Sequence, residues 1–116
     1  MMDCIFCRIS SGEIPARLVF ESDTVFAFHD ISPQAPVHIL VVPRQHAATA
    51  ADLVSSPGGG QVMAELLNAA VEVARQQGLA EQGYRFVINT GRQGGQTVDH
   101  LHLHILGGRP MGWPPG

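Results

Sequence analysis

The chain contains no lysine: all seven of its basic residues are arginine. This absence excludes a lysine Schiff base, a lysine–nucleotide adduct and the lysine of a P-loop. Any covalent chemistry on a nucleotide would need another nucleophile. The arginines are spread from Arg8 to Arg109, and the net charge is −3. Because no basic cluster is present, we expect neither a nucleic-acid partner nor an anionic-membrane surface.

Long apolar runs are also missing. No stretch approaches the ~18 residues of a membrane-spanning helix. The opening "MMDCIFCRISSG" has no basic segment followed by a long apolar stretch, so we expect no signal peptide and a cytoplasmic location. Hydrophobic residues make up 45% of the chain and charged residues 15%, a balance typical of a compact globular protein. We therefore expect one domain over residues 1–116.

Cysteine is scarce, and its placement is informative. The two cysteines, Cys4 and Cys7, form a Cys-x-x-Cys pair. In a chain with no sign of secretion, such a pair favours metal binding or redox chemistry over a structural disulfide.

Hydrophobic periodicity predicts an α+β fold. A short helix or turn is expected over residues 3–15, and a main helix from about Gln61 to Gln77, whose apolar residues fall on one stripe. Strands are expected over 17–23, 24–30, 37–43, 84–89 and 100–108. This order predicts a mainly antiparallel sheet of about five strands with the main helix on one face.

The last predicted strand carries a regular histidine pattern. His100, His102 and His104 alternate with three apolar residues, in a chain with six histidines. Side chains alternate faces along a strand, so the three imidazoles are predicted to share one face, roughly 6–7 Å apart in succession. Polar residues on a half-exposed strand, a metal site and acid–base or nucleophilic chemistry are all compatible with this pattern.

A glycine-rich loop, "NTGRQGGQTVD", precedes the histidines. Its glycines allow backbone N–H groups to approach an anion closely. Asn89, Gln96 and Thr97 add side-chain donors. A donor-rich turn beside three histidines favours a phosphate over a metal as their shared target. The pattern therefore favours phosphoryl or nucleotidyl transfer, in which one histidine attacks phosphorus.

The segment "HLHLHIL", with the loop before it, resembles the signature of the histidine triad (HIT) superfamily, His-φ-His-φ-His-φ-φ with φ apolar. The segments "FHDISPQAP", "GYRFVINTGRQGGQ" and "WPPG" resemble the Hint branch, the purine nucleoside phosphoramidases. The likeness covers most of the chain and is weakest over about residues 47–80. It implies a HIT-like fold and a homodimer whose two sheets join into one continuous sheet.

The resemblance also implies a reaction: hydrolysis of nucleoside 5′-phosphoramidates, above all adenosine 5′-monophosphoramidates. His102 would attack the α-phosphorus and form a nucleotidyl-histidine, from which water releases the monophosphate. His104 would help bind the phosphate and the leaving side, and the carbonyl of His100 would fix the tautomer of the nucleophile. Thr97 completes the implied catalytic set, at a position where the family commonly has serine.

Binding roles follow from the same resemblance. Asp30 matches an acid that hydrogen-bonds the ribose hydroxyls. His38 matches a buried histidine beside the triad, and Trp113 lies in a tail that reaches the partner's active site. For the apolar residues in this set, the alternative to nucleotide binding is plain core packing. For Asp30, the alternative is a role in a turn or a helix cap. The nucleotide-binding matches are Phe6, Ile9, Phe28, His29, Asp30, Ile31, Leu40, Asn89, Gly95, Gln96, Thr97, His102 and His104.

Cys4 and Cys7 resemble the "C-x-F-C" opening of many bacterial HIT proteins, which can hold a structural zinc with two histidines. The implied partners are His46 and His100. Two cysteines and two histidines suit tetrahedral zinc and would leave His102 free for phosphate chemistry. The alternative is a reduced, packed cysteine pair with His46 at the surface. No catalytic cofactor is expected.

Three other functions are compatible with the sequence. The first is a dinucleoside polyphosphate hydrolase of the same superfamily, which a comparison of kcat/KM on the two substrate types would identify. The second is a purine-nucleotide-binding or scaffold protein with incidental catalysis, which would bind nucleotides tightly with negligible turnover. The third is a zinc hydrolase that uses the histidines directly and would lose activity on chelation.

Overall fold

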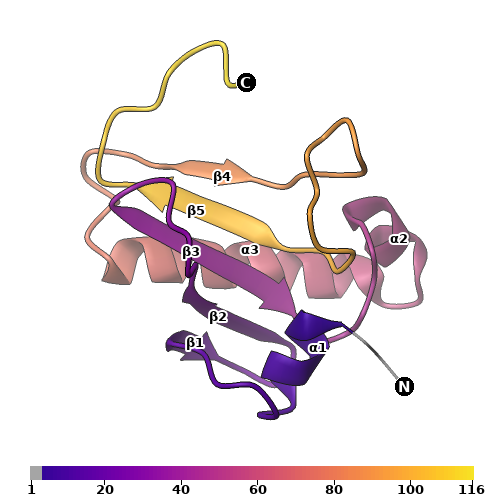
Figure 1. Ribbon diagram of the computed structural model, residues 1–116. Helices are drawn as coiled ribbons and strands as arrows, with labels where there is room; N and C mark the ends of the chain where they lie inside the picture. Colours follow the sequence, from indigo (N-terminus) through magenta and orange to yellow (C-terminus); the bar gives the residue numbers. More distant parts are fainter. Residues whose placement is uncertain (1–3) are drawn as a thin grey trace.

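The computed structural model describes residues 4–116, so the first three residues of the predicted domain lie outside it. Across this range, no helix combines the length and hydrophobicity that a membrane span requires. The elements are α1 (Ile5–Ser10), β1 (Leu18–Glu21), β2 (Val25–His29), β3 (Val37–Pro43), α2 (Ala50–Ser55), α3 (Gly59–Gln76), β4 (Arg85–Val87) and β5 (Leu103–Gly107) (Figure 1).

Residues 4–116 form one antiparallel sheet of five strands in the order β1-β2-β3-β5-β4. Helix α3 lies along one face of this sheet, and α1 lies on the other face near β2 and β3 (Figure 1). The predicted α+β class, with a mainly antiparallel sheet and one main helix, is therefore confirmed.

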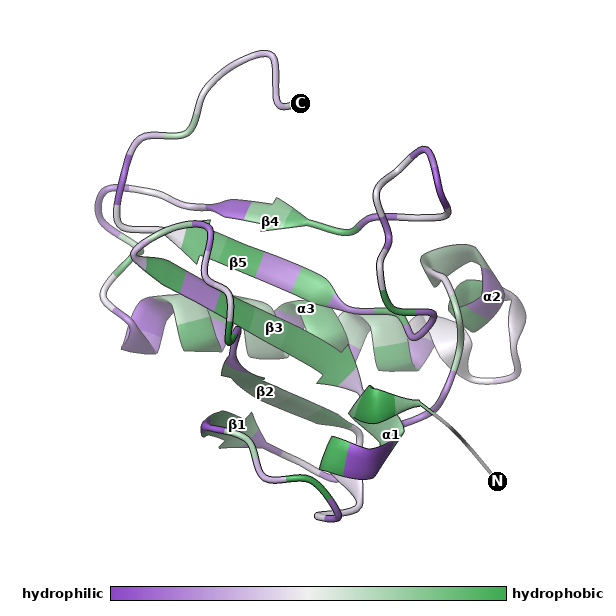
Figure 2. Ribbon diagram, viewed as in Figure 1, coloured by the Kyte–Doolittle hydropathy of each residue, from purple (hydrophilic) through white to green (hydrophobic). Residues whose placement is uncertain are grey.

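Alternation along the central strands divides the core between the two faces of the sheet. In β2, Val25 and Ala27 pack in the core on the α3 side, whereas Phe26 and Phe28 pack on the other side with Phe6 of α1. Figure 2 shows that β2 and β3 are mostly hydrophobic, as expected for strands buried on both faces. The face opposite α3 therefore has an apolar floor, which helix α1 covers in part and against which Ala16 and Val98 also pack.

Strand β5 places one histidine over that apolar floor. Leu103 and Ile105 are fully buried in the core on the α3 side, so His104 between them faces the α1 side. Across the ladder His104 is paired with Leu40 of β3. The sheet thus brings an imidazole next to an apolar surface.

The last strand is shorter than the sequence predicts. The expected strand covers residues 100–108, but β5 begins at Leu103, so the first two histidines of the triad precede it. The neighbouring strand β3 ends at Pro43, which has no N–H to continue the ladder. The Leu101 N–H instead donates to the Ala47 carbonyl at 2.8 Å. The chain before β5 is therefore held by the segment that follows β3.

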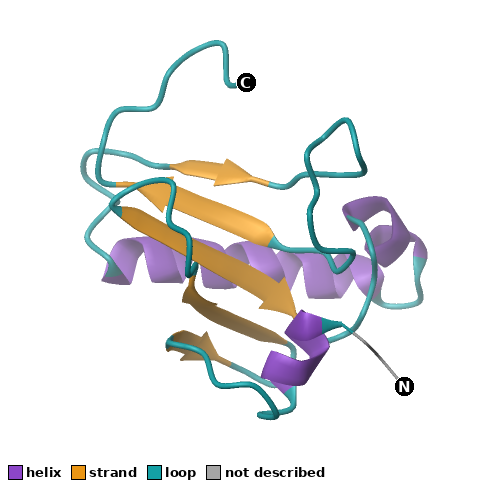
Figure 3. Ribbon diagram, in the orientation of Figure 1, coloured by secondary structure: helices purple, strands orange, loops and turns teal. Residues whose placement is uncertain are grey.

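Helix α2 was not predicted from the sequence, because its six residues are too few to show a clear helical period. Thr49 caps it by accepting a hydrogen bond from the Asp52 N–H at 3.1 Å. Helix α3 starts before the predicted Gln61, and β4 is shorter than the predicted strand over 84–89. Because β4 and β5 are short, a long loop connects them and an irregular tail follows β5 (Figure 3).

The junction of α2 and α3 gives a test of this packing. A methyl group on Gly59 would overlap the backbone carbonyl of Leu53, whereas Gly60 has open space at the same position. We expect Gly59→Ala to lower the free energy of unfolding by about 2 kcal/mol or more, because the two helices must move apart. The matched Gly60→Ala should raise it by up to about 1 kcal/mol, because alanine favours the helix. Chemical denaturation measures both, and equal effects would contradict this junction.

Candidate active site

A pocket of about 370 Å³ lies on the α1 side of the sheet. It is bounded by α1, by β2 and β3, and by the loop that leads into β5. Most of the predicted nucleotide-binding residues line it: Phe6, Ile9, Phe28, His29, Asp30, Ile31, Leu40, Thr97, His102 and His104. The lining also includes residues that the sequence did not single out: Ile5, Ile14, Pro15, Ala16, Arg17 and Val98. The structure thus brings together residues from both ends of the chain.

Three predicted residues, Asn89, Gly95 and Gln96, are not among those that line the pocket. The Gln96 amide donates to the carbonyls of Ala48 at 2.6 Å and Val98 at 2.9 Å, and its oxygen accepts from the Gly91 N–H at 3.0 Å. Gln96 therefore holds the glycine-rich loop together instead of offering its donors to a ligand. The sequence identified a polar side chain here but not the direction of its hydrogen bonds.

The tautomer of His102 is fixed by one hydrogen bond. Its Nδ1 lies 2.7 Å from the carbonyl oxygen of His100, which can only accept, so Nδ1 carries the proton. In the neutral form of this buried ring, the lone pair is therefore on Nε2. Phe6 supports the ring from the side at a centroid distance of 5.1 Å. An imidazole held in this form can act as a nucleophile or a base.

His104 has the opposite tautomer, set by a chain of hydrogen bonds. The Gln34 N–H donates to Nδ1 of His38 at 3.0 Å. His38 must then carry its proton on Nε2, which donates to Nδ1 of His104 at 2.9 Å. His104 is left with a proton on Nε2, and within residues 4–116 this is the buried side-chain polar atom without a partner. A buried N–H without an acceptor costs about 1–3 kcal/mol, which a bound acceptor would recover.

His38 and His104, the two histidines of this hydrogen-bond chain, are neutral near neutral pH. Burial, together with the neighbouring His102 and His38, lowers the pKa of His104 to about 4, against an opposing effect of Asp30. Burial likewise lowers the pKa of His38, again opposed by Asp30. The Asp30 carboxylate lies 3.4 Å from Nε2 of His38 and accepts the Ser32 N–H at 2.7 Å. Asp30 therefore has the predicted alternative role in a turn and also faces the histidines.

Cys4, Cys7, His46 and His100 converge, with their ligand atoms all within 4.8 Å of one another. Nδ1 of His100 lies 3.3 Å from the Cys4 sulfur, 3.6 Å from the Cys7 sulfur and 3.1 Å from Nδ1 of His46. A tetrahedral ion with bonds of about 2.0–2.3 Å holds its ligand atoms about 3.3–3.8 Å apart, which is close to this spacing.

The protonation of this cluster also fits a metal. The Nε2–H of His100 donates to the Pro43 carbonyl at 2.8 Å, so the lone pair of Nδ1 faces the sulfurs. Burial and the adjacent Cys4 raise the pKa of the Cys7 thiol to about 11. The Cys7 thiol therefore resists ionisation unless a cation compensates the negative charge, as a bound metal does. His46 is exposed at the rim, as the alternative reading expected, yet its Nδ1 lies 3.4 Å from the Cys7 sulfur.

The three histidines of the triad do not converge on one ion. The ring of His100 belongs to the cysteine cluster, whereas His102 and His104 line the pocket with ring centroids 5.0 Å apart. The separation is shorter than the sequence suggested; the expected spacing assumed a continuous strand, whereas His102 precedes β5. Ligand atoms of Asp30, His38 and His104 also lie close together, but hydrogen bonds already connect both histidines.

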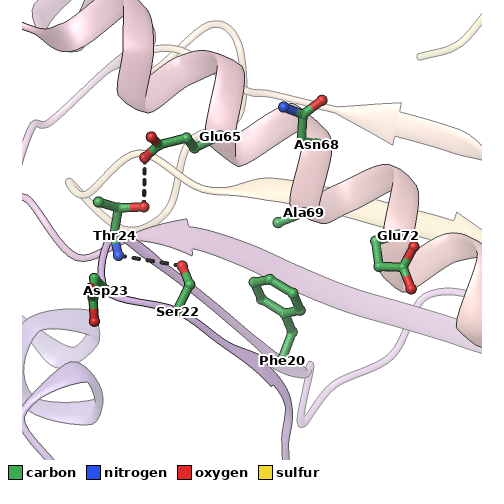
Figure 4. Close-up of a pocket in the computed structure, with 8 residues that line it drawn as sticks. All are labelled: Phe20, Ser22, Asp23, Thr24, Glu65, Asn68, Ala69 and Glu72. Atoms are coloured by element: carbon green, nitrogen blue, oxygen red, sulfur yellow. Dashed lines mark hydrogen bonds between the residues drawn. The ribbon is translucent and has the colours of Figure 1, made fainter.

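A second hollow, of about 520 Å³, lies on the opposite face between the β1–β2 turn and α3 (Figure 4). Two of its carboxylates have partners: Thr24 donates to Glu65 at 2.7 Å, and Arg75 pairs with Glu72. None of the eight residues that line it is a histidine or cysteine. The chemistry-bearing side chains are thus gathered on the α1 side.

Comparisons with known proteins agree with this geometry. The HIT domain family model matches residues 11–111. A purine nucleoside phosphoramidase of Escherichia coli is 46% identical over 110 residues, which cover 95% of this chain and 91% of that protein. A 14 kDa zinc-binding protein of Brassica juncea is 46% identical over 114 residues, which cover 98% and 100%.

A solved structure gives the same result for the fold. The HIT family hydrolase of Legionella pneumophila superposes with a TM-score of 0.93 at 49% sequence identity, covering 98% of this chain and 100% of that chain. The family model, the relatives and the paired histidines on the pocket wall all lead to one assignment: the chain belongs to the HIT domain family.

Proposed function

We propose that the protein hydrolyses nucleoside 5′-phosphoramidates, with adenosine 5′-monophosphoramidates as its main substrates. The observation that carries this proposal is the pair of imidazoles on one pocket wall whose hydrogen bonds favour opposite tautomers. His102 offers an unprotonated Nε2, and His104 offers an Nε2–H that lacks an acceptor. A nucleophile beside a hydrogen-bond donor is the arrangement that attack on a phosphate requires. The name of the Escherichia coli relative supports the same substrate class.

In this mechanism Nε2 of His102 attacks the α-phosphorus in line with the leaving amine. The new N–P bond forms as the P–N bond to the amine breaks, and the amine nitrogen takes up a proton from solvent as it leaves. The Nε2–H of His104 donates to a phosphate oxygen on the leaving side. The His102 ring gains positive charge, which the His100 carbonyl stabilises through Nδ1–H at 2.7 Å. Water then attacks phosphorus, releases the nucleoside monophosphate and regenerates His102. The attacking water returns one proton to solvent in this second step.

The rest of the pocket would bind the nucleoside. The base would lie among the apolar residues Phe6, Phe28 and Leu40, each of which is buried. Asp30 would accept hydrogen bonds from the ribose hydroxyls. Thr97 and the backbone of the glycine-rich loop would contact the phosphate, with Gln96 acting through the shape of that loop.

Replacement of the nucleophile tests the mechanism. We expect His102→Ala to lower kcat at least about 10³-fold on an adenosine phosphoramidate, because no other group can form the intermediate. The Kd of adenosine monophosphate should change by no more than about threefold, because His102 acts mainly in the transition state. Intact-mass analysis of the wild type with a slow substrate should detect the nucleotidyl adduct. An active His102→Ala protein would overturn the mechanism, and a higher kcat/KM on diadenosine polyphosphates would reassign the substrate.

We further propose that Cys4, Cys7, His46 and His100 hold a structural zinc ion. The four converging ligand atoms support this, and so does the name of the Brassica juncea relative. The metal would stabilise the N-terminal segment, and none of the catalytic steps above uses it. His102 and His104 would stay free for the phosphate.

Metal analysis tests the zinc proposal. We expect about one zinc ion per chain in the purified protein and a clear loss of zinc in Cys4→Ser, because a hydroxyl is a poor zinc ligand. The matched control is His29→Gln, which removes a histidine that lines the pocket but lies outside the cluster and should keep the metal. Wild-type protein without zinc would end this proposal.

The protein is also proposed to be a homodimer with a continuous sheet. Strand β4 lies at one edge of the sheet, and the apolar side chains of Leu67, Val71, Tyr84 and Trp113 are exposed. An open edge strand, together with apolar side chains exposed elsewhere on the surface, favours pairing with a second copy. Trp113 is 83% exposed in a tail that leaves the sheet, as a contact in trans would require (Figure 1).

Sedimentation velocity tests the dimer. We expect a dimer for the wild type and a monomer for Val71→Asp, because the charge would be buried in the interface. The matched control is Val54→Asp on α2, at a residue of similar exposure, which should remain dimeric. A monomeric wild type at micromolar concentration would contradict the proposal.

A further inference from the structure

We infer that the cysteine–histidine cluster controls the nucleotide affinity of the pocket through helix α1, so that metal binding and nucleotide binding strengthen each other. This inference rests on the proposed function, since it takes the cluster as the metal site and the pocket as the nucleotide site. It assigns Phe6 as the positioning residue that connects them.

Helix α1 depends on the rest of the protein for its position. It has only six residues, too few for a helix that is stable by itself. Within α1, all of which is described, only Phe6 is buried. At its C-terminal end, Arg44 donates to the carbonyl and hydroxyl of Ser10 at 3.1 and 3.0 Å. The N-terminal half is therefore held by Phe6 and by the contacts of Cys4 and Cys7 with the cluster.

Helix α1 also forms one wall of the pocket. Ile5, Phe6 and Ile9 line the pocket opposite the floor formed by β2 and β3. Phe6 stands between the two cysteines in sequence, so a metal bound to both sulfurs would fix its backbone from either side. Without that restraint, the wall can move away from the floor and the pocket loses apolar contact with a base.

Phe6 is also the side chain that reaches both sites. Its ring packs edge-on against His100 of the cluster at 5.8 Å and against His102 of the pocket at 5.1 Å. It further contacts Phe28 of the floor at 5.7 Å. A displacement of Phe6 would therefore be transmitted from the metal ligands to the nucleotide pocket through direct packing.

A second connection, through His100, is less sensitive to the metal. The His100 carbonyl positions His102. The ring of His100 is itself anchored by a hydrogen bond from its Nε2–H to the Pro43 carbonyl at 2.8 Å. This anchor does not depend on the cysteines. Metal loss should therefore weaken nucleotide binding and raise KM more than it lowers kcat.

The test uses adenosine monophosphate as the probe and titration calorimetry as the readout. We expect removal of zinc from the wild type to raise the Kd about tenfold, within the usual range for coupled sites. In Phe6→Ala, which lacks the connecting ring, zinc removal should change the Kd by about twofold at most. The matched control is Leu40→Ala, at a buried pocket residue of the same apolar cluster on β3, where the tenfold effect of zinc should persist.

A reciprocal measurement on the wild type decides the outcome even if a variant fails to fold. Coupling between two sites is symmetric, so saturating nucleotide should lower the Kd of zinc for the wild type about tenfold in competition with a chelator. An unchanged zinc Kd would overturn the coupling, as would equal nucleotide affinity of folded protein with and without zinc. A zinc-loaded protein that binds no nucleotide would instead overturn the proposed function itself.

Discussion

The Nε2–H of His100 donates to the Pro43 carbonyl, and both parts of the site depend on this hydrogen bond. It turns the lone pair of Nδ1 toward Cys4 and Cys7, which makes the residue a suitable metal ligand. It also fixes the backbone from which the His100 carbonyl accepts the proton of His102. One buried residue thus connects a compact cysteine cluster with an imidazole on the wall of an open pocket.

A second constraint is the alternation of faces in the sheet. Because Leu103 and Ile105 are buried on the α3 side, His104 must face the α1 side, where His38 from the neighbouring strand meets it. Burial keeps both rings neutral, and the Gln34 N–H sets the direction of the proton chain. The donor that results has no partner within the described residues, which is a cost to stability that a bound phosphate oxygen would remove.

Much of the fold could be predicted because it follows from local patterns. Strand β3 matches its predicted residues because it is a nearly continuous apolar, β-branched run. Helix α3 matches within two residues at its start because it has a clear helical period. Helix α2 and the true start of β5 were not predictable in this way. The first is too short to show a period, and the second depends on where Pro43 of another strand ends the ladder. Gln96 illustrates the same limit, because its hydrogen-bond partner Ala48 is distant in sequence.

The sequence by itself determined the family likeness, the α+β class and the side chains available for chemistry, because motif spacing and periodicity are local properties. Only the tertiary structure decided which of those side chains join the cysteine cluster and which line the pocket. It separated His100 from the other two triad histidines, fixed opposite tautomers on His102 and His104, and placed Phe6 between the cluster and the pocket. The physical reason is that tautomers and contacts are set by hydrogen-bond and packing partners, and several of these, such as His38 for His104 and Phe6 for His102, are distant in the sequence.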